Sequence, residues 1–207
     1  MAARKRLARK FFLRSTLRVA QNLLGKYLVH KIGSRKIVGK IVETEAYIGP
    51  VDLASHARRG KVTSRNLAEY MLGGHVYIYL VYGMYWQLNF STGTSGKPEC
   101  VLIRALEPIA PLKIKNKKLK IKNTNKKMKI SNLANGPGKL CRYMKLDRRH
   151  YGLDLVTSRE VWLETGEQIP KSKIVRAKRI GIDYAGKYWA TKKWRFYIKD
   201  NPFVSKI

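Results

Sequence analysis

Short strand-like segments, separated by turn residues, constrain the fold of this chain more than any other feature. Gly33-Ser34 between two such segments predicts a hairpin. The expected strands lie at residues 27–32, 36–47, 75–81, 85–91, 100–106, 152–156, 174–182 and 194–199. The pattern lacks an alternating strand–helix–strand rhythm and internal repeats. We therefore expect an α+β fold, a single domain with a curved antiparallel β-sheet and surrounding short helices.

Capping residues indicate where the short helices begin and end. Ser15 is a candidate N-cap for an apolar-periodic segment that Gly25 ends, and Ser64 is one for a short helix to Met71. A third helix is expected to open at Asn135-Gly-Pro-Gly-Lys139 and to run to about Met144. A length of 207 residues suits one domain with one hydrophobic core.

The charge balance points to a polyanionic partner. Lys and Arg number 44 against 13 Asp and Glu, which gives a net charge of +31. Such a surplus is typical of a phosphate-binding surface, although an anionic membrane surface and a Lys-rich genome are competing explanations. No apolar run approaches the roughly 18 residues of a spanning helix.

Two basic segments stand apart from the predicted domain. Residues 1–10 are expected to form a flexible basic arm. Residues 113–129 contain nine Lys, and no acid occurs between Glu107 and Asp147. This composition predicts a Lys-rich flexible loop that stays solvated.

Cysteine usage and the chain start suggest an intracellular protein without a metal. Cys100 and Cys141 are isolated, so neither a zinc motif nor a redox pair is expected. The N-terminus lacks the apolar core of a signal peptide, but its Arg-rich, acid-free character leaves organelle import open. We expect a reducing, intracellular location as the default.

An acidic pair in a hydrophobic strand is the first candidate for chemistry. The period of two places Glu43, Glu45 and Tyr47 on the same side of the strand. Either carboxylate is explained by an ion pair with an arginine, or by a role as general base for water. Spacing alone does not choose between the two glutamates.

Aromatic residues and one histidine suggest a pocket for a nucleic-acid base. Tyr77 and Tyr79 share one face of a strand, which ordinary strand propensity also explains. Tyr82 lies beside Gly83 at a turn, where an exposed ring is able to wedge into a base stack. His56 lies in a polar loop and is a candidate to bond or stack on a ligand, although a loop histidine is more often incidental.

Taken together, these segments resemble the alkyladenine (3-methyladenine) DNA glycosylase family of base-excision repair. The resemblance runs from about Phe11 to Ser205. Its carriers include Val42-Glu-Thr-Glu-Ala-Tyr-Ile-Gly-Pro50, Ala54-Ser-His56, Val76-Tyr-Ile-Tyr-Leu-Val-Tyr-Gly-Met-Tyr85, Asn89, Val101-Leu-Ile-Arg-Ala-Leu-Glu-Pro108 and Asn135-Gly-Pro-Gly-Lys-Leu140.

The resemblance assigns expected roles to particular residues. It makes Glu45 the base that activates a water to attack the sugar C1′, helped by Arg104 and the backbone carbonyl of Ile180. The expected base pocket consists of Tyr47, His56, Tyr79 and Asn89, with Asn89 set against a guanine 2-amino group. The expected DNA-intercalating residues are Tyr82 and Met84, and the DNA-backbone contacts are Lys139, Arg58, Arg59 and Arg65.

The resemblance also implies an activity. The protein is expected to be a monofunctional DNA-3-methyladenine glycosylase that flips damaged purines (3-methyladenine, 7-methylguanine, hypoxanthine, ethenoadenine) out of double-stranded DNA. We expect no cofactor, no metal, no membrane and a monomer. The sequence departs from the family pattern in the expanded loop at 113–129 and at Asp183-Tyr184. Neither departure touches a residue with an expected catalytic role.

Two other classes of protein compete with this interpretation. A non-enzymatic basic binder explains the charge but not the meeting of an acid, a histidine and a ring cluster. A metal-dependent nuclease needs a carboxylate or histidine cluster, and Glu43 with Glu45 is the one close acid pair in the sequence. A measurement of hydrolytic activity in the presence of a metal chelator separates the glycosylase, the binder and the nuclease.

Overall fold

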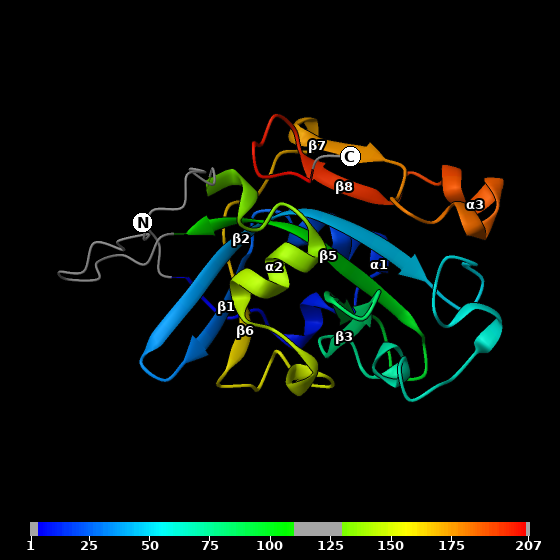
Figure 1. Cartoon of the computed structure of the whole chain (residues 1–207), viewed down its shortest axis with the longest axis horizontal. Helices are drawn as coiled ribbons and strands as arrows, with labels where there is room; N and C mark the ends of the chain where they lie inside the picture. The colour runs from blue at the N-terminus through cyan, green and yellow to red at the C-terminus, as the bar shows by residue number, and fades with distance from the viewer. Residues whose placement is uncertain (1–3, 110–129, 206–207) are drawn as a thin grey trace.

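An eight-stranded antiparallel sheet organises the chain (Figure 1). The computed structural model describes residues 4–109 and 130–205. The strand order is β3-β4-β5-β2-β1-β6, with β8 also on β2 and β7 on β8. The strands are β1 (Tyr27–Ile32), β2 (Arg35–Ile48), β3 (Val76–Val81), β4 (Tyr85–Ser91), β5 (Glu99–Ile109), β6 (Val161–Glu164), β7 (Ile174–Ala177) and β8 (Arg195–Ile198). The predicted α+β class is confirmed.

The long central strand β2 changes partner along one edge. β5 pairs with it along most of its length, while β1 occupies the other edge up to Lys40 and β8 takes over from Glu43. The β2–β5 register also shifts between Ile41 and Thr44. A strand that exchanges neighbours and carries a bulge bends locally. We call the point where β8 replaces β1 beside β2 the fork of the sheet, and Glu43 and Glu45 lie just beyond it.

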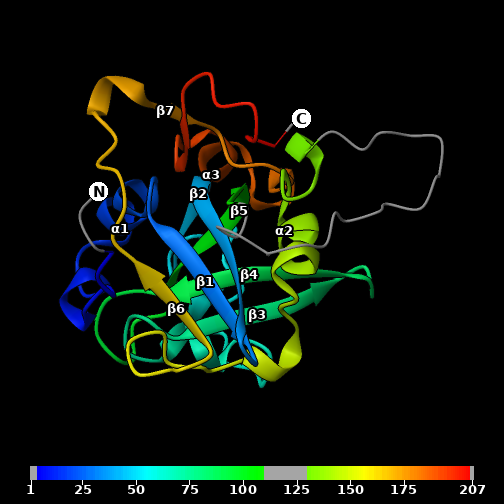
Figure 2. The ribbon, with the colours of Figure 1, turned by 90° about the vertical axis from the view of Figure 1, so that its left-hand side faces the viewer.

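Short helices pack around this sheet. In Figure 2, α1 lies to one side of β1 and β2, and α2 lies to the other. The α-helices are α1 (Thr16–Leu23), α2 (Pro137–Met144) and α3 (Lys187–Thr191). The 3₁₀ helices are η1 (Arg9–Phe11), η2 (Arg58–Gly60), η3 (Leu67–Tyr70), η4 (Ile130–Asn132), η5 (Arg148–His150), η6 (Lys171–Lys173) and η7 (Asp183–Ala185). None of the helices in these two described stretches is long and apolar enough to cross a membrane.

The hydrophobic core lies between the helices and the sheet. The buried face of α1 consists of Val19, Ala20 and Leu23, and that of α2 includes Leu140 and Met144. These side chains pack with residues of β2, β4, β5 and β8 in one cluster. Both cysteines are buried and free.

Several predicted elements differ from the structure. β6 was not expected, and residues 152–156 form turns around one isolated bridge, between Asp154 and His75, instead of a strand. There Asp154 Oδ1 accepts a hydrogen bond from Val156 N at 2.9 Å, a local bond that competes with strand pairing. The strand expected at 174–182 stops at Ala177, because the next residues turn towards β2.

The N-terminal segment also differs from the prediction of a flexible arm. The backbone N–H of Leu7 donates to Leu163 O at 2.9 Å, and Leu7 is buried. Arg6 pairs with Glu164 in an isolated bridge, and Arg9 contacts Asp154 in an ion pair. Residues 5–7 therefore extend the edge of the sheet at β6, and η1 follows them. The Lys-rich loop predicted at 113–129 lies outside the described residues.

Candidate active site

A cavity of about 470 Å³ lies beside the fork of the sheet. Such a volume is in the usual range for small-molecule sites. Its walls come from the end of β2, from β3, β4 and β5, and from two loops. The lining includes eight of the predicted site residues, namely Tyr47, His56, Arg65, Tyr79, Tyr82, Asn89, Arg104 and Ile180.

Glu45 is completely buried and bonded to three of the residues that surround the cavity. Its Oε1 accepts a hydrogen bond from Ile180 N at 2.9 Å and lies 3.3 Å from Arg104 Nη1. Its Oε2 accepts from Tyr47 Oη at 2.9 Å. Glu45 itself is not among the lining residues. Its carboxylate is thus held at a fixed place at the inner end of the pocket wall.

Glu43 has a different environment although it shares the same face of β2. Its Oε1 accepts from Arg195 Nη1 at 2.9 Å, and its Oε2 accepts from Ser205 N at 2.8 Å. Neither partner lines the cavity. Glu43 therefore connects β8 and the C-terminal segment to β2. This contact agrees with the ion-pair role that the sequence analysis considered for either glutamate.

Arg104 lies between the two glutamates. Its Nε is 3.4 Å from Glu43 Oε1, while its Nη1 faces Glu45. Burial alone would lower the pKa of Arg104, but the charges of Glu45 and Glu43 together raise it. The guanidinium thus remains charged and fixes the orientation of Glu45.

Three rings form a wall of the cavity. The ring centroids of His56 and Tyr79 are 4.6 Å apart in an edge-to-face arrangement. Tyr47 extends from the end of β2, and burial, followed by the nearby Glu45 charge, raises its pKa well above the usual value. Burial and the charges of Arg65 and Arg58 lower the pKa of His56 to about 4. His56 is consequently neutral at pH 7, with Nδ1 bonded to Tyr77 Oη.

A polar cluster that the sequence did not reveal forms another part of the wall. It consists of Asn89, Cys100 and Glu69, all buried. The amide of Asn89 is fixed by Nδ2 bonds to the carbonyls of Tyr77 and Gln87, both 3.2 Å. Cys100 Sγ donates to Glu69 Oε1 at 3.4 Å, and Glu69 Oε2 has no hydrogen-bond partner in the described part of the chain.

Glu69 is protonated over most of the physiological pH range. Burial is the main cause, and it raises the pKa of Glu69 to about 8 despite the hydrogen bonds from Cys100 and Asn66. The cavity thus receives a neutral carboxylic acid with a free O–H donor, in addition to the buried carboxylate of Glu45. In the sequence Glu69 carried no signal, because it is a single acid in the mostly apolar segment Leu67-Ala-Glu-Tyr-Met71 and belongs to none of the motifs described above.

Tyr82 occupies the tip of the β3–β4 hairpin at the mouth of the cavity. It is 86% exposed, and its φ of 51° is followed by a φ of 67° at Gly83. Val81 pairs with Tyr85, so three residues connect the strands, and Met84 N donates to Val81 O at 3.2 Å in a β-turn with Tyr82 and Gly83 at its centre. A turn with positive φ at both central positions favours Asn or Gly, so a tyrosine at the first position is unfavourable. Met84 on the same turn is 63% exposed. The turn therefore presents two apolar side chains to solvent.

The predicted phosphate contacts are exposed but are not all together. Arg65 Nη2 donates to Leu80 O at 2.9 Å, and its guanidinium lies 5.0 Å from the Tyr79 ring centroid. Arg58 and Arg59 are exposed in η2, close to His56 in sequence. Lys139 is on α2 instead, where its Nζ donates to Asn135 Oδ1 at 3.0 Å. Met84, Arg58, Arg59 and Lys139 do not line the cavity.

A buried ion pair braces the pocket and was not expected from the sequence. Arg179 Nη2 donates to Asp52 Oδ1 at 2.9 Å, and a second bond joins Nη1 to the other carboxylate oxygen. The same guanidinium bonds to Ala46 O at 3.0 Å and covers the Tyr47 ring at 4.7 Å. It thereby fixes Ile180 against Glu45 and the loop that carries His56. No motif links residues 127 positions apart, so sequence spacing gave no signal.

Comparison with known proteins places the chain in a family. The model of the family described as methylpurine-DNA glycosylase (MPG) matches residues 10–202. A protein of Natranaerobius thermophilus is 44% identical over 196 residues, which cover 95% of this chain and 96% of that protein. One of Clostridium perfringens strain SM101 is 45% identical over 204 residues (97% and 99%), and one of Borreliella burgdorferi is 42% identical over 198 (96% and 98%). All three are provisionally named 3-methyladenine DNA glycosylase.

Fold, pocket and matches together define the class as DNA glycosylases, hydrolytic enzymes of DNA repair. The match spans nearly the whole chain and all the elements that build the cavity. The chain belongs to the methylpurine-DNA glycosylase family. The resemblance seen in the sequence is therefore confirmed.

Proposed function

We propose that the cavity receives a damaged purine flipped out of double-stranded DNA and that Glu45 activates the water that breaks the N-glycosidic bond. One observation carries the proposal: Glu45 accepts hydrogen bonds from Tyr47 and Ile180, which line the cavity, whereas the hydrogen-bond donors to Glu43, Arg195 and Ser205, do not. Arg104 lines the cavity and forms an ion pair with both glutamates. A buried carboxylate with fixed donors is a suitable base for water and stabilises positive charge that develops on the sugar.

The target carbon lies inside a stacked duplex, so the nucleotide must leave the stack before water attacks. Tyr82 is the residue suited to fill the resulting gap, because its ring is exposed on a sharp turn at the cavity mouth. Base–aromatic stacking contributes about 1–3 kcal/mol per base, which offsets the cost of unstacking. Met84 is proposed to contact the neighbouring bases.

The pocket suits purines whose glycosidic bond is already weakened by alkylation. An alkylated purine carries positive charge, and Tyr47, His56 and Tyr79 offer electron-rich ring faces to it. The proposed substrates are 3-methyladenine, 7-methylguanine, hypoxanthine and ethenoadenine. Asn89 acts as the filter against guanine, because its amide is fixed by two backbone carbonyls and has little freedom to make room for a 2-amino group.

Phosphates of the DNA are proposed to contact the exposed cations around the cavity. Arg58, Arg59 and Arg65 lie in the same connection between β2 and β3 as His56, and Lys139 lies on α2. The net charge of +31 supplies non-specific affinity and a strong salt dependence. We propose that the protein acts as a monomer, inside the cell and with DNA.

A paired mutation tests the assignment of the base. Glu45→Gln preserves shape and removes the base, so we expect lesion binding to survive while single-turnover excision falls by at least about 10²-fold. The matched control is Glu43→Gln on the same face of the same strand. Free base released from duplexes with a single hypoxanthine or 3-methyladenine is the measurement. A large loss in Glu43→Gln together with a nearly active Glu45→Gln contradicts the proposal.

A further inference from the structure

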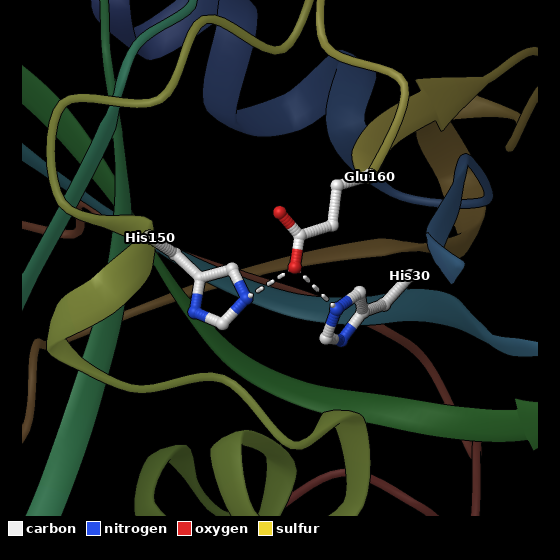
Figure 3. Close-up of side chains that lie close together, drawn as sticks. All are labelled: His30, His150 and Glu160. Atoms are coloured by element: carbon white, nitrogen blue, oxygen red, sulfur yellow. Dashed lines mark hydrogen bonds and ion pairs between the residues drawn. The ribbon is translucent and has the colours of Figure 1, made fainter. Parts of the chain in front are cut away.

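Two of the four histidines of this chain meet a glutamate at the opposite end of β1 from the central fork (Figure 3). His30 lies in β1, His150 ends η5, and Glu160 immediately precedes β6. One donor atom from each lies within 4.8 Å of the others. None of the three lines the cavity, so the cluster is separate from the glycosylase site.

The hydrogen bonds of His30 leave a lone pair facing a carboxylate. Its Nδ1 is 2.6 Å from Met144 O, and a carbonyl only accepts, so Nδ1 carries a proton. The other nitrogen of the neutral ring, Nε2, is therefore an acceptor, and it lies 3.4 Å from Glu160 Oε1. Two acceptors that face each other require a cation between them, which is either a second proton or a metal ion.

His150 directs a third donor atom to the same point. Its Nε2 is buried, lies 3.5 Å from Glu160 Oε1 and has no hydrogen-bond partner among the described residues. Its Nδ1 is 3.2 Å from both the backbone N and the backbone O of Asp147. When Nδ1 accepts from the Asp147 N–H, as in a capping box, Nε2 carries the proton, and when Nδ1 donates to the Asp147 carbonyl, Nε2 is free to bind a metal. A ligating histidine whose other nitrogen donates to a backbone carbonyl is the usual arrangement in metal sites.

The two histidine-to-carboxylate separations fit tetrahedral coordination. Zn²⁺ binds histidine nitrogen and carboxylate oxygen at about 2.0–2.2 Å, so tetrahedral ligand atoms lie about 3.3–3.5 Å apart. The two nitrogen-to-Oε1 distances, 3.4 and 3.5 Å, match this value. The site is also built in advance, because both histidines are buried and Lys31 N donates to Glu160 O at 2.8 Å.

We propose that His30, His150 and Glu160 form a structural Zn²⁺ site, with water as the fourth ligand. Glu160 is exposed and provides the entry path for the ion, while the histidines come from the sheet edge and from the turn after α2. The ion would cross-link β1, η5 and the start of β6. The meeting of these three side chains was not expected from the sequence. Residues 30, 150 and 160 form no motif along the chain.

Calorimetric titration of the untagged, EDTA-treated full chain with Zn²⁺ tests the proposal. We expect one Zn²⁺ per chain and a higher Tm in its presence. Glu160→Gln, at an exposed position, should lower the affinity at least tenfold, and His30→Gln or His150→Gln should abolish binding. Co²⁺ should give a visible absorption band of tetrahedral type that Glu160→Gln alters.

His75→Gln is the matched control, because His75 lies outside the cluster and its Nδ1 contacts Leu72 O. This variant should bind Zn²⁺ like the wild type. The proposal is overturned if the wild type binds no stoichiometric Zn²⁺ or if Glu160→Gln binds it unchanged. In either case the cluster is an ion pair held by a proton. The Glu45 variants test the glycosylase proposal separately.

Discussion

The unusual ionisation of Glu69 should make the stability of this protein depend on pH in a particular direction. The pKa of Glu69 is about 8 in the folded protein, whereas the ordinary value for a glutamate is 4.5. The folded state therefore binds one more proton than the unfolded state between these values. Stability falls as pH rises through this window, by about 1.4 kcal/mol per pH unit for one proton.

The window from pH 6.5 to 8 isolates this effect. His56 has a folded pKa of about 4 against 6.5, so its stabilising contribution is complete above pH 6.5 and is lost only as pH falls. Across 1.5 pH units Glu69 should reduce the free energy of unfolding by about 2 kcal/mol. The Glu69→Gln variant has no proton to lose and should lack this decline.

Urea denaturation at pH 6.5, 7, 7.5 and 8 measures the difference between wild type and Glu69→Gln. The pH dependence of that difference is the readout, because other titrating groups are common to both proteins. Any effect of the substitution on stability that does not depend on pH cancels in this comparison. Parallel profiles for the two proteins over this range would show that Glu69 is ionised in the folded state and would refute the reasoning.

Three further outcomes are expected. Tyr82→Ala should weaken flipping and lesion-specific binding, with a smaller loss when the lesion is already mismatched, and a fluorescent base reports flipping; an unchanged signal counts against the wedge. Asn89→Ser should raise release of undamaged guanine relative to hypoxanthine, and an equal ratio in both proteins argues against a steric filter. Excess EDTA should leave the excision rate unchanged, since the proposed Zn²⁺ site is outside the cavity, but it should lower the Tm. Loss of excision that Mg²⁺ restores would indicate metal-assisted hydrolysis.

Much of the fold followed from local patterns. The hairpin of β1 and β2, the exact span of β4 and the helix that Gly25 ends were predicted, because alternation, turn residues and caps act within a few residues. Missed elements have weak local signals. β6 has four residues, and the segment at 152–156 loses its strand to the hydrogen bonds of Asp154.

The sequence by itself determined the basic surface, the strand that carries Glu43 and Glu45, and the ring-bearing hairpin, since each depends on neighbouring residues. Tertiary structure gave different partners to the two glutamates, which the sequence spacing treats alike. Glu43 meets Arg195 while Glu45 meets Ile180 and the pocket wall. It also made Glu69 a neutral acid and brought His30 to His150, because burial and contacts between residues more than 30 positions apart arise only when the chain folds.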